Sequence, residues 1–295
     1  EMETGFLAQE LAKIFGLPQN KVGFSGRKDK WALTIQWFSL DLSSFQQRNH
    51  VNNLLERIEE QLPVKIKEVS YHTNALKAGH LLGNNFKILL SGTSSASPAL
   101  VNKIQKEIEK KGLPNFFGPQ RFGYEGKNLE TANKLLERNR PFRKKEKFYA
   151  SVLQAHLFNL YLILRIQENS FLEVLEGDIC KKHETGGIFL VKNAERERKR
   201  FLNKEISFTG PIYGYKMKWP LGKAKKWEEE ILAQVNLEGQ ILRQLRWKGS
   251  RRVGRIFPKD WTIQRTEEGF CFSFFLPKGS YATILMREFQ KTDNP

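Results

Sequence analysis

A single acid stands among cations near the start of the chain, in the stretch GFSGRKDK from Gly23 to Lys30. Asp29 has Arg27, Lys28 and Lys30 as its charged neighbours. Nearby cations favour the ionised form of a carboxylate, and an ionised carboxylate is a usable nucleophile towards an anomeric or an electrophilic ring carbon. Most acids with basic neighbours only form structural ion pairs, here within a turn. The stretch therefore leaves two interpretations open, a reactive carboxylate and a structural one.

A second candidate site is NFFGPQRFG, which begins at Asn115 in a glycine-rich segment. The amide of Asn115 can offer hydrogen bonds to the edge of a uracil or a similar base, and Phe117 offers a flat face for stacking. Arg121 can contact phosphate, and Gly118 allows a close approach of the backbone. The alternative is a glycine-rich turn with buried phenylalanines.

The charge of the chain indicates a polyanionic partner. Its 295 residues carry a formal net charge of +17, which usually marks such a partner. The positive charge is clustered in four runs, RNRPFRKKEK (138–147), ERERKR (195–200), KMKWPLGKAKK (216–226) and RWKGSRRVGR (246–255). Aromatic residues are interleaved with the runs, namely Phe142, Trp219, Trp227 and Trp247. Lys and Arg can meet phosphates while aromatic rings stack on bases, so nucleic acid is the favoured partner. For ERERKR alone, alternating signs favour a solvated helix face.

Other classes of protein and site are not favoured. No apolar run approaches the roughly 20 residues that cross a bilayer, and the opening segment does not resemble a secretory signal. The two cysteines, Cys180 and Cys271, and the five histidines show no spacing typical of disulfide frameworks or metal sites. The phosphate-binding loop, the GxGxxG pattern and the GxSxG pattern do not occur in the sequence. We expect a cytoplasmic protein without metal or cofactor, acting as a monomer away from membranes.

Hydrophobic periodicity predicts the elements that must position these residues. Helices are expected at 3–15, 52–61, 97–111, 128–138, 151–166, 193–203 and 225–247. Strands are expected at 22–24, 33–40, 64–71, 85–90, 186–192 and 270–276, with a strand or strand-to-turn element at 279–289. Asp29 then falls in a connection between two strands, where a scaffold can fix its position. Strand-rich ends around a helix-rich middle predict an α+β domain with an insertion, and the composition changes at 138–147.

Four segments together resemble the TruD family of tRNA pseudouridine synthases. GFSGRKDKWALTIQWFSL is similar to the motif around the family's nucleophilic aspartate, and LKAGHLLGNNFKILL to its next block. NFFGPQRFG resembles N-[YF]-F-G-x-Q-R-F-G, and FFLPKGSYATILMRE resembles the terminal F-x-L-P-x-G-S-[YF]-A-T motif. These blocks run in the family's order from residue 1 to about 290.

The resemblance implies an isomerase that converts uridine to pseudouridine in tRNA without a cofactor, with uridine 13 as the family substrate. It also implies an α+β fold, in which helices flank a mixed β-sheet in the pseudouridine-synthase catalytic domain. That domain is discontinuous, 1–140 and 257–295, and an inserted α/β (TRUD) domain spans 141–256. Flanking domains of this kind would form a basic cleft for the RNA.

Residue by residue, the resemblance places Asp29 on the nucleophile, with Lys28 beside it in the motif. Asn115 and Tyr281 fall on positions expected to line the uracil-ribose pocket. Phe117 falls where this family has Phe and many other pseudouridine synthases have Tyr. Together with Arg121, these residues form the predicted substrate site.

One block of the family has no counterpart in this sequence, the N-terminal block with a PEDF-like motif, which supplies a substrate-contacting Phe and a Lys near the aspartate. Two functions from other classes also remain open. The first is a non-catalytic RNA-binding protein or tRNA chaperone, and the second is a basic scaffold that docks on an acidic protein. The acid inside the basic loop favours the enzyme, because neither alternative needs it.

Overall fold

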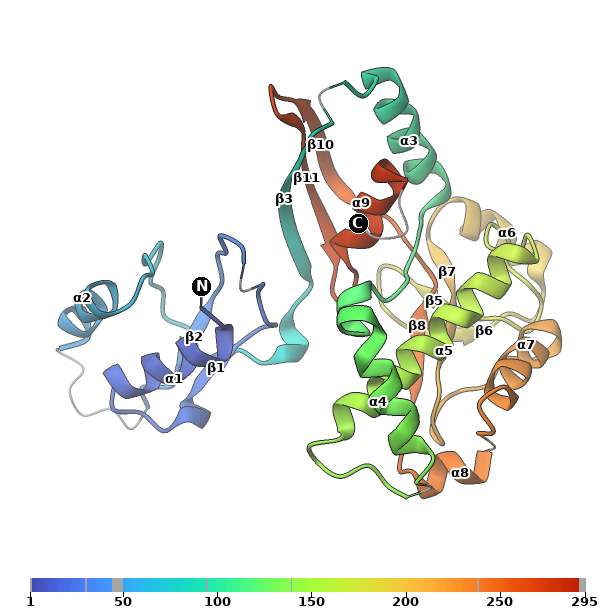
Figure 1. The fold of residues 1–295 in the computed structure, drawn as a ribbon, viewed down its shortest axis with the longest axis horizontal. Coiled ribbons are helices and arrows are strands. Elements are labelled where there is room, and N and C mark those ends of the chain that lie inside the picture. The colour runs from blue at the N-terminus through green and yellow to red at the C-terminus, as the bar shows by residue number, and fades with distance from the viewer. Residues whose placement is uncertain are drawn as a thin grey trace. The chain divides into compact units, whose positions relative to one another are not determined.

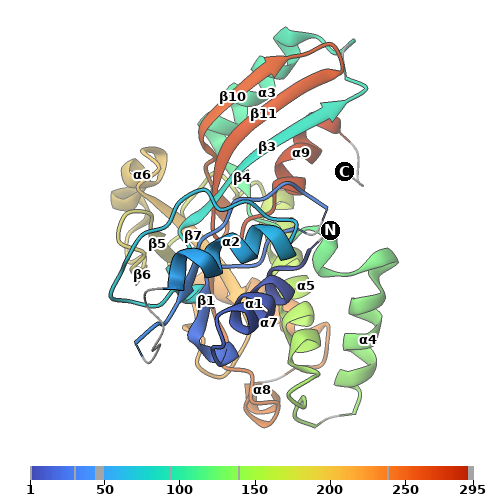
Figure 2. The same ribbon diagram turned by 90° about the vertical axis from the view of Figure 1, so that its left-hand side faces the viewer.

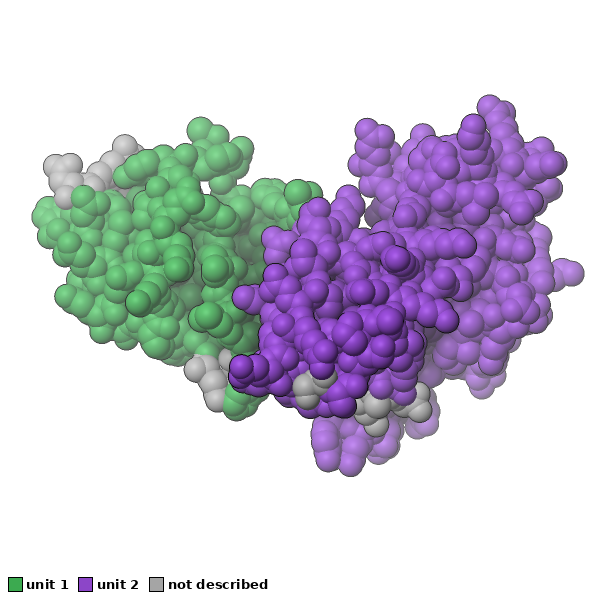
Figure 3. Space-filling model, turned by 90° about the horizontal axis from the view of Figure 1, so that it is seen from above, with its two compact units in different colours: residues 1–82 green, residues 83–295 purple. Residues whose placement is uncertain are grey.

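The computed structural model describes residues 2–29, 31–43, 50–93, 95–138, 140–237 and 239–291. Lys30, predicted above as a neighbour of Asp29, lies outside these ranges. The chain forms two compact units, unit 1 with residues 1–82 and unit 2 with residues 83–295 (Figure 3). No helix in the described ranges is both long and apolar enough to cross a membrane.

Unit 1 packs two helices with a short antiparallel pair of strands (Figure 1). Its elements are α1 (Thr4–Ile14), β1 (Val22–Phe24), β2 (Phe38–Leu40) and α2 (Val51–Gln61). Both helices turn apolar residues to one core, which holds Ala8, Leu11, Ala12, Phe15, Val22, Leu54 and Ile58. Helices were predicted at nearly these positions, and the core explains why, because apolar residues recur at helical spacing on one face.

Two strand predictions in unit 1 are wrong. The strand expected at 33–40 contains only residues 38–40, and segment 64–71 is irregular. The register pairs Val22 with Leu40 and Phe24 with Phe38, so the three residues of β1 provide partners for three residues of β2 and no more. A β-branched and aromatic composition favours a strand only where a partner strand is present. The apolar side chains just before β2 are instead exposed, among them Leu33 and Ile35.

Unit 2 contains a three-stranded antiparallel sheet in the order β10-β11-β3. Its strands are β3 (Gly83–Ser91), β10 (Lys259–Arg265) and β11 (Gly269–Pro277). Side chains at alternate positions of a strand point to the same face, and β11 buries Phe270, Phe272, Phe274 and Leu276. The predicted strand at 270–276 is thus confirmed. Helices α3 (Pro98–Lys111) and α9 (Ala282–Gln290) cover this face (Figures 1 and 2).

The segment 279–289, predicted as a strand or strand-to-turn element, is a helix from Ala282 onwards. Ile284, Leu285 and Met286 are buried against the sheet together with residues of α3. The β-branched residues near its start suggested a strand, but burial against the face of β11 stabilises the helix. Tertiary packing of this kind often overrides local propensity.

A second sheet of unit 2 has four strands in the order β6-β5-β7-β8, all antiparallel. They are β5 (Ile179–Lys182), β6 (Ile188–Leu190), β7 (Ile206–Ile212) and β8 (Ser250–Val253). Helix α5 (Lys147–Gln167) packs on β7 through Phe158 and Tyr161, which share a core with Phe208. The remaining helices of the unit are α4 (Lys127–Leu136), α6 (Ala194–Leu202), α7 (Gly222–Ala233) and α8 (Gly239–Gln244). These four strands fall within 141–256, and the domain boundaries themselves stay a prediction.

The single helix expected at 225–247 is two helices, α7 and α8. Between them Asn236 has a backbone φ of +52°, a left-handed conformation that interrupts a right-handed helix and that Asn tolerates better than most residues. Leu237 next to it is buried. The break lets the chain bury Leu237 in the turn, which a continuous amphipathic pattern does not reveal.

Two further strands, β4 (Leu113–Pro114) and β9 (Arg255–Ile256), form a short antiparallel pair. Leu113 lies opposite Ile256, and Pro114 opposite Arg255. This pairing brings the residues after β4 beside the end of β8. It therefore joins two parts of the chain that are far apart in the sequence.

Candidate active site

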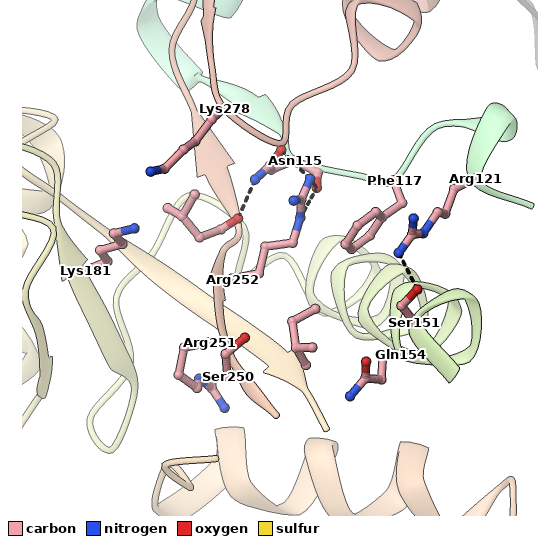
Figure 4. A pocket seen from close by; sticks show the side chains of 12 residues that line it. Asn115, Phe117, Arg121, Ser151, Gln154, Lys181, Ser250, Arg251, Arg252 and Lys278 are labelled. Carbon is pink, nitrogen blue, oxygen red and sulfur yellow. Dashed lines mark hydrogen bonds between the residues drawn. The ribbon is translucent and has the colours of Figure 1, made fainter. Parts of the chain in front are cut away.

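A hollow of about 310 Å³ opens in unit 2 beside the β4–β9 pair (Figure 4). It is lined by Asn115, Phe117, Arg121, Ser151, Gln154, Lys181, Ile212, Ser250, Arg251, Arg252, Val253 and Lys278. They come from the loop after β4, from α5, from strands β5, β7 and β8, and from the loop after β11. We call this hollow the basic pocket, because five of its lining residues are Arg or Lys.

Asn115 forms one wall of the basic pocket and is 4% exposed. Its backbone N–H donates to the Gly254 carbonyl oxygen (2.9 Å), and its Nδ2 donates to the Val253 carbonyl oxygen (2.9 Å). Its Oδ1 accepts from Arg252 Nη2 (2.8 Å). An amide nitrogen has two hydrogens, and within the described ranges one acceptor, the Val253 carbonyl oxygen, meets the Asn115 nitrogen.

Phe117 lies within a cluster of rings and a cation. Its ring meets Phe158 edge-on, with centroids 5.6 Å apart, and lies 6.0 Å from the ring of Tyr281. The guanidinium carbon of Arg252 stands 4.0 Å from the centroid of Phe117, within cation–π range. A Cβ on Gly118 would come within 2.9 Å of Tyr281 Cδ1, so glycine is required for Tyr281 to approach the loop this closely.

The backbone of Phe117 is held by the side chain of Asn159, which belongs to none of the motifs described above. Asn159 on α5 accepts from the Phe117 N–H through Oδ1 (2.9 Å) and donates from Nδ2 to the Phe117 carbonyl oxygen (3.0 Å). An Asn can satisfy both backbone groups of one residue only when its amide lies in their plane. The one available signal was an amide in the otherwise apolar run LFNLYL.

Arg121 lies on the edge of the basic pocket. Its Nη2 donates to Ser151 Oγ (2.7 Å), and its guanidinium carbon lies 5.3 Å from the ring centroid of Phe148. Its Nε is buried and has no hydrogen-bond partner among the described residues. Figure 4 shows Arg121 and Ser151 on one side of the pocket and Lys181 and Lys278 on the other.

Arg252 is the central residue of the basic pocket (Figure 4), and in the sequence it stands out only as part of the basic run 246–255. It donates from Nε and Nη2 to the Asn115 carbonyl oxygen (3.2 and 3.0 Å), and from Nη2 to the Gly279 carbonyl oxygen (2.8 Å). Burial lowers the pKa of Arg252 to about 10, which still leaves the guanidinium protonated at neutral pH. Arg252 therefore ties the loop of Asn115 to the loop that precedes Tyr281.

The loop that carries Asp29 belongs to unit 1, and the Asp29 side chain is exposed. The Lys28 N–H donates to Thr4 Oγ1 on α1 (2.9 Å), and Gln36 Nε2 donates to the Gly26 carbonyl oxygen (2.9 Å). These two bonds fix the loop at both ends. The structure thus brings Asn115, Phe117, Arg121 and Tyr281 together in unit 2 and places Lys28 and Asp29 in unit 1. That Asp29 faces the basic pocket stays a prediction.

No group of three His, Cys, Asp or Glu side chains is placed to hold a metal ion in the part of the chain that the structure describes. The chemistry available in the basic pocket is therefore that of amides, hydroxyls, aromatic faces and cations. Such a set can bind and orient an anionic or aromatic ligand.

A family model and the relatives found by comparison with known proteins carry the same description. The family model described as tRNA pseudouridine synthase D (TruD) matches residues 1–141 and 140–289. A tRNA pseudouridine synthase D from Thermus thermophilus is 39% identical over 282 residues, which cover 94% of this chain and 76% of the relative. A protein of the same name from an Anaeromyxobacter species is 34% identical over 291 residues, covering 95% of this chain and 80% of the relative.

One solved structure is similar along nearly the whole chain. It is a crystal structure from Methanosarcina mazei, described as a candidate tRNA pseudouridine synthase D, with a TM-score of 0.65. It is 21% identical, and the match covers 98% of this chain and 85% of that one. At this identity the likeness supports the mixed α+β fold.

Proposed function

The chain belongs to the TruD family of tRNA pseudouridine synthases, which are isomerases, and from this premise we propose that it converts uridine 13 of tRNA to pseudouridine with Asp29 as the nucleophile. The observation that carries the proposal is the motif GFSGRKDK, which places one carboxylate on a loop anchored at both ends. The reaction conserves every atom and electron, so it needs no redox cofactor and no co-substrate.

The substrate proposed is a uridine that has left its stack. The glycosidic bond is inaccessible inside folded RNA, and extruding a base costs a few kcal/mol. Phosphate contacts and aromatic stacking offset this cost. The net charge of +17 supports this mode of binding.

Asp29 is proposed to attack the flipped uridine. Three routes are compatible with a carboxylate in this position, namely attack at the ribose C1′, addition to the base, and proton abstraction in a glycal route. In each, the glycosidic bond from N1 breaks, the detached uracil turns, and C5 forms the new bond to C1′. The proton on C5 is then lost, and N1 regains one.

The residues of unit 2 are proposed to hold the uridine during this rotation. Asn115 and Tyr281 orient the uracil and ribose, Phe117 lines the same site, and Arg121 and Lys28 contact phosphate. The hydrogen bonds from Asn159 to Phe117 and from Arg252 to Asn115 support this assignment, because they fix the proposed contacts before substrate arrives. Pre-organised positioning of this kind can supply much of the rate enhancement.

The alternative function is a non-catalytic tRNA-binding protein or chaperone, for which the same cationic surface would suffice. An unmodified tRNA transcript with uridine at position 13, incubated with the protein and mapped for pseudouridine, separates the two. We expect pseudouridine at position 13, and none in a matched transcript with cytidine there. Binding of both transcripts without any pseudouridine would favour the chaperone.

A further inference from the structure

The basic pocket has an unbalanced charge. Of its twelve lining residues five are basic, and none is Asp or Glu. Arg251 is neutralised, because Glu228 accepts from its Nη1 (2.8 Å) and Nη2 (2.7 Å) in a buried pair. The ion pairs of the described chain include no carboxylate partner for Arg121, Lys181 or Arg252. Arg121, Lys181 and Arg252 are half-buried. Like charges that line one concave site repel one another and attract a counter-ion, so the site is suited to an anion.

The hydrogen-bonding groups of the pocket also favour an anion, because donors on positively charged groups lack acceptors in the described chain. Arg252 uses Nε and Nη2 on the carbonyl oxygens of Asn115 and Gly279 and on Asn115 Oδ1, and no described residue accepts from its Nη1. Arg121 Nε is buried with no partner in the described chain. Both are donors on positively charged groups, and donors of this kind bind phosphate oxygens strongly.

A uracil ring fits these donors less well than a phosphate does. Uracil carries no charge, and its N3–H needs an acceptor. The two oxygens of Asn115 already accept from Arg252. The Gln154 side-chain nitrogen donates to the Tyr213 carbonyl oxygen (2.6 Å), so of the two lining amides Gln154 keeps one oxygen that can accept, against several cationic donors. A phosphodiester offers only acceptors and one negative charge, which matches a pocket of cationic donors.

We propose that the cations of the basic pocket, Arg252, Lys181 and Arg121, bind a backbone phosphodiester of the substrate RNA, while the uracil is held at the wall that Asn115 and Phe117 form. The proposal rests on the proposed function only in that the ligand is an RNA strand. In this proposal, two parts of the site bind two parts of the RNA. The pocket fixes the strand through a phosphate, and the rings of Phe117 and Tyr281 lie beside it for the base and ribose. Arg252 then couples phosphate binding to the loops of Asn115 and Tyr281.

The first test measures binding of an unmodified tRNA transcript to the Lys181→Gln variant over a range of salt concentrations. Each phosphate contact contributes about 0.7–0.9 to the slope of log K against log salt concentration. We expect the slope of Lys181→Gln to be less steep by about that amount, with binding about fivefold to eightfold weaker at 0.1 M salt. The matched control is Lys106→Gln, which removes an exposed lysine of α3 outside the pocket.

The second test asks whether Lys181 acts through one phosphate. Single neutral methylphosphonate linkages are placed in turn at the phosphates around the target uridine of the same tRNA. We expect one linkage to weaken binding of the wild-type protein about fivefold and to have no further effect on Lys181→Gln. Arg121→Gln, which removes another of the three proposed phosphate contacts, gives the same coupling if Lys181→Gln fails to fold.

Two results would overturn the proposal. One is an equal salt slope for Lys181→Gln and Lys106→Gln, and the other is additive loss of binding at every methylphosphonate position. Both measurements report RNA binding and need no turnover. Absence of pseudouridine in the wild-type samples would therefore contradict the proposed function and leave the phosphate site to be decided by the slopes.

Discussion

The two hydrogen bonds between Asn159 and the backbone of Phe117 give the sharpest test of how the site is positioned. Substitution Asn159→Ala removes both bonds and leaves a half-buried N–H and carbonyl oxygen without their partner. Substitution Asn159→Asp keeps the shape and the acceptor but replaces the donor with an oxygen that faces the Phe117 carbonyl oxygen. Asn159→Ala therefore tests the loss of the two hydrogen bonds, and Asn159→Asp tests repulsion between two oxygens at the Phe117 carbonyl.

The expected loss of stability follows from the two contacts. An unsatisfied buried polar group costs about 1–3 kcal/mol, and two such groups set a range of about 2–6 kcal/mol. The basic pocket lies beside Phe117, so water can reach the freed groups, and we expect Asn159→Ala at the lower end, about 2–3 kcal/mol. The Phe117 loop would also lose its alignment, and a displacement of about 1 Å can lower turnover about 100-fold.

Urea unfolding measures the free energy of unfolding, and single-turnover pseudouridine formation at saturating enzyme measures the chemical step. The matched control is Asn133→Ala, the same substitution on an exposed face of α4, which we expect to stay within about 0.5 kcal/mol of the wild-type protein. A positioning role for Asn159 would be refuted if Asn159→Ala had the same free energy of unfolding as Asn133→Ala and kept wild-type turnover. The two hydrogen bonds from Asn159 to Phe117 would then contribute neither to stability nor to positioning.

Three further predictions concern the core of unit 2. Asp178→Asn breaks the fully buried pair with Arg165 (2.7 Å) and should cost about 3–5 kcal/mol in urea unfolding, because a buried guanidinium loses its counter-ion. Gly254→Ala should cost about 1–3 kcal/mol by the same measurement, because a Cβ there would overlap the ring of Phe208. Burial raises the pKa of the Cys180 thiol, so Cys180 should resist alkylation at pH 8 in the folded protein and react after denaturation.

The two substitutions among these, Asp178→Asn and Gly254→Ala, each have a matched control variant. Glu168→Gln removes an exposed ion pair with Lys223 (3.0 Å) and should cost less than about 1 kcal/mol. Gly187→Ala adds a Cβ whose nearest neighbour is Thr185 Oγ1 at 3.5 Å, so it should leave the free energy of unfolding nearly unchanged. Equal losses within either pair of variants, or rapid alkylation of native Cys180, would contradict the packing described for unit 2.

The sequence predicted those elements whose pattern is set by a nearby core. The alternating phenylalanines of β11 and the helical spacing of Leu11 and Phe15 reflect burial on one face, which is visible locally. Residues 33–37 carry the same β-type composition and are irregular, because β1 provides partners only for residues 38–40. Whether a partner strand is present depends on the whole fold, so it cannot be predicted from a short window of the sequence.

For the candidate site, the sequence motifs predicted some of the residues that the structure brings together and missed others. The resemblance of the motifs predicted Asn115, Phe117 and Tyr281 as substrate contacts. The structure brings the three residues together in unit 2, and their role in binding stays a prediction. The motifs did not identify Arg252, which lies 137 residues from the Asn115 that it contacts, or Asn159, which is 42 residues from Phe117. Contacts at such separations depend on the β4–β9 pairing and on the packing of α5. A short sequence motif predicts neither of these long-range arrangements.

The proposed chemistry depends most on the carboxylate of Asp29, and one comparison of two proteins tests its role directly. The isosteric Asp29→Asn variant is assayed beside the wild-type protein for binding of an unmodified tRNA transcript and for pseudouridine at position 13. We predict wild-type affinity within about twofold, since the loop and its neighbouring cations are kept, and no detectable pseudouridine, since an amide is not a nucleophile here. Pseudouridine formed by Asp29→Asn at a rate near that of the wild-type protein would contradict the central claim.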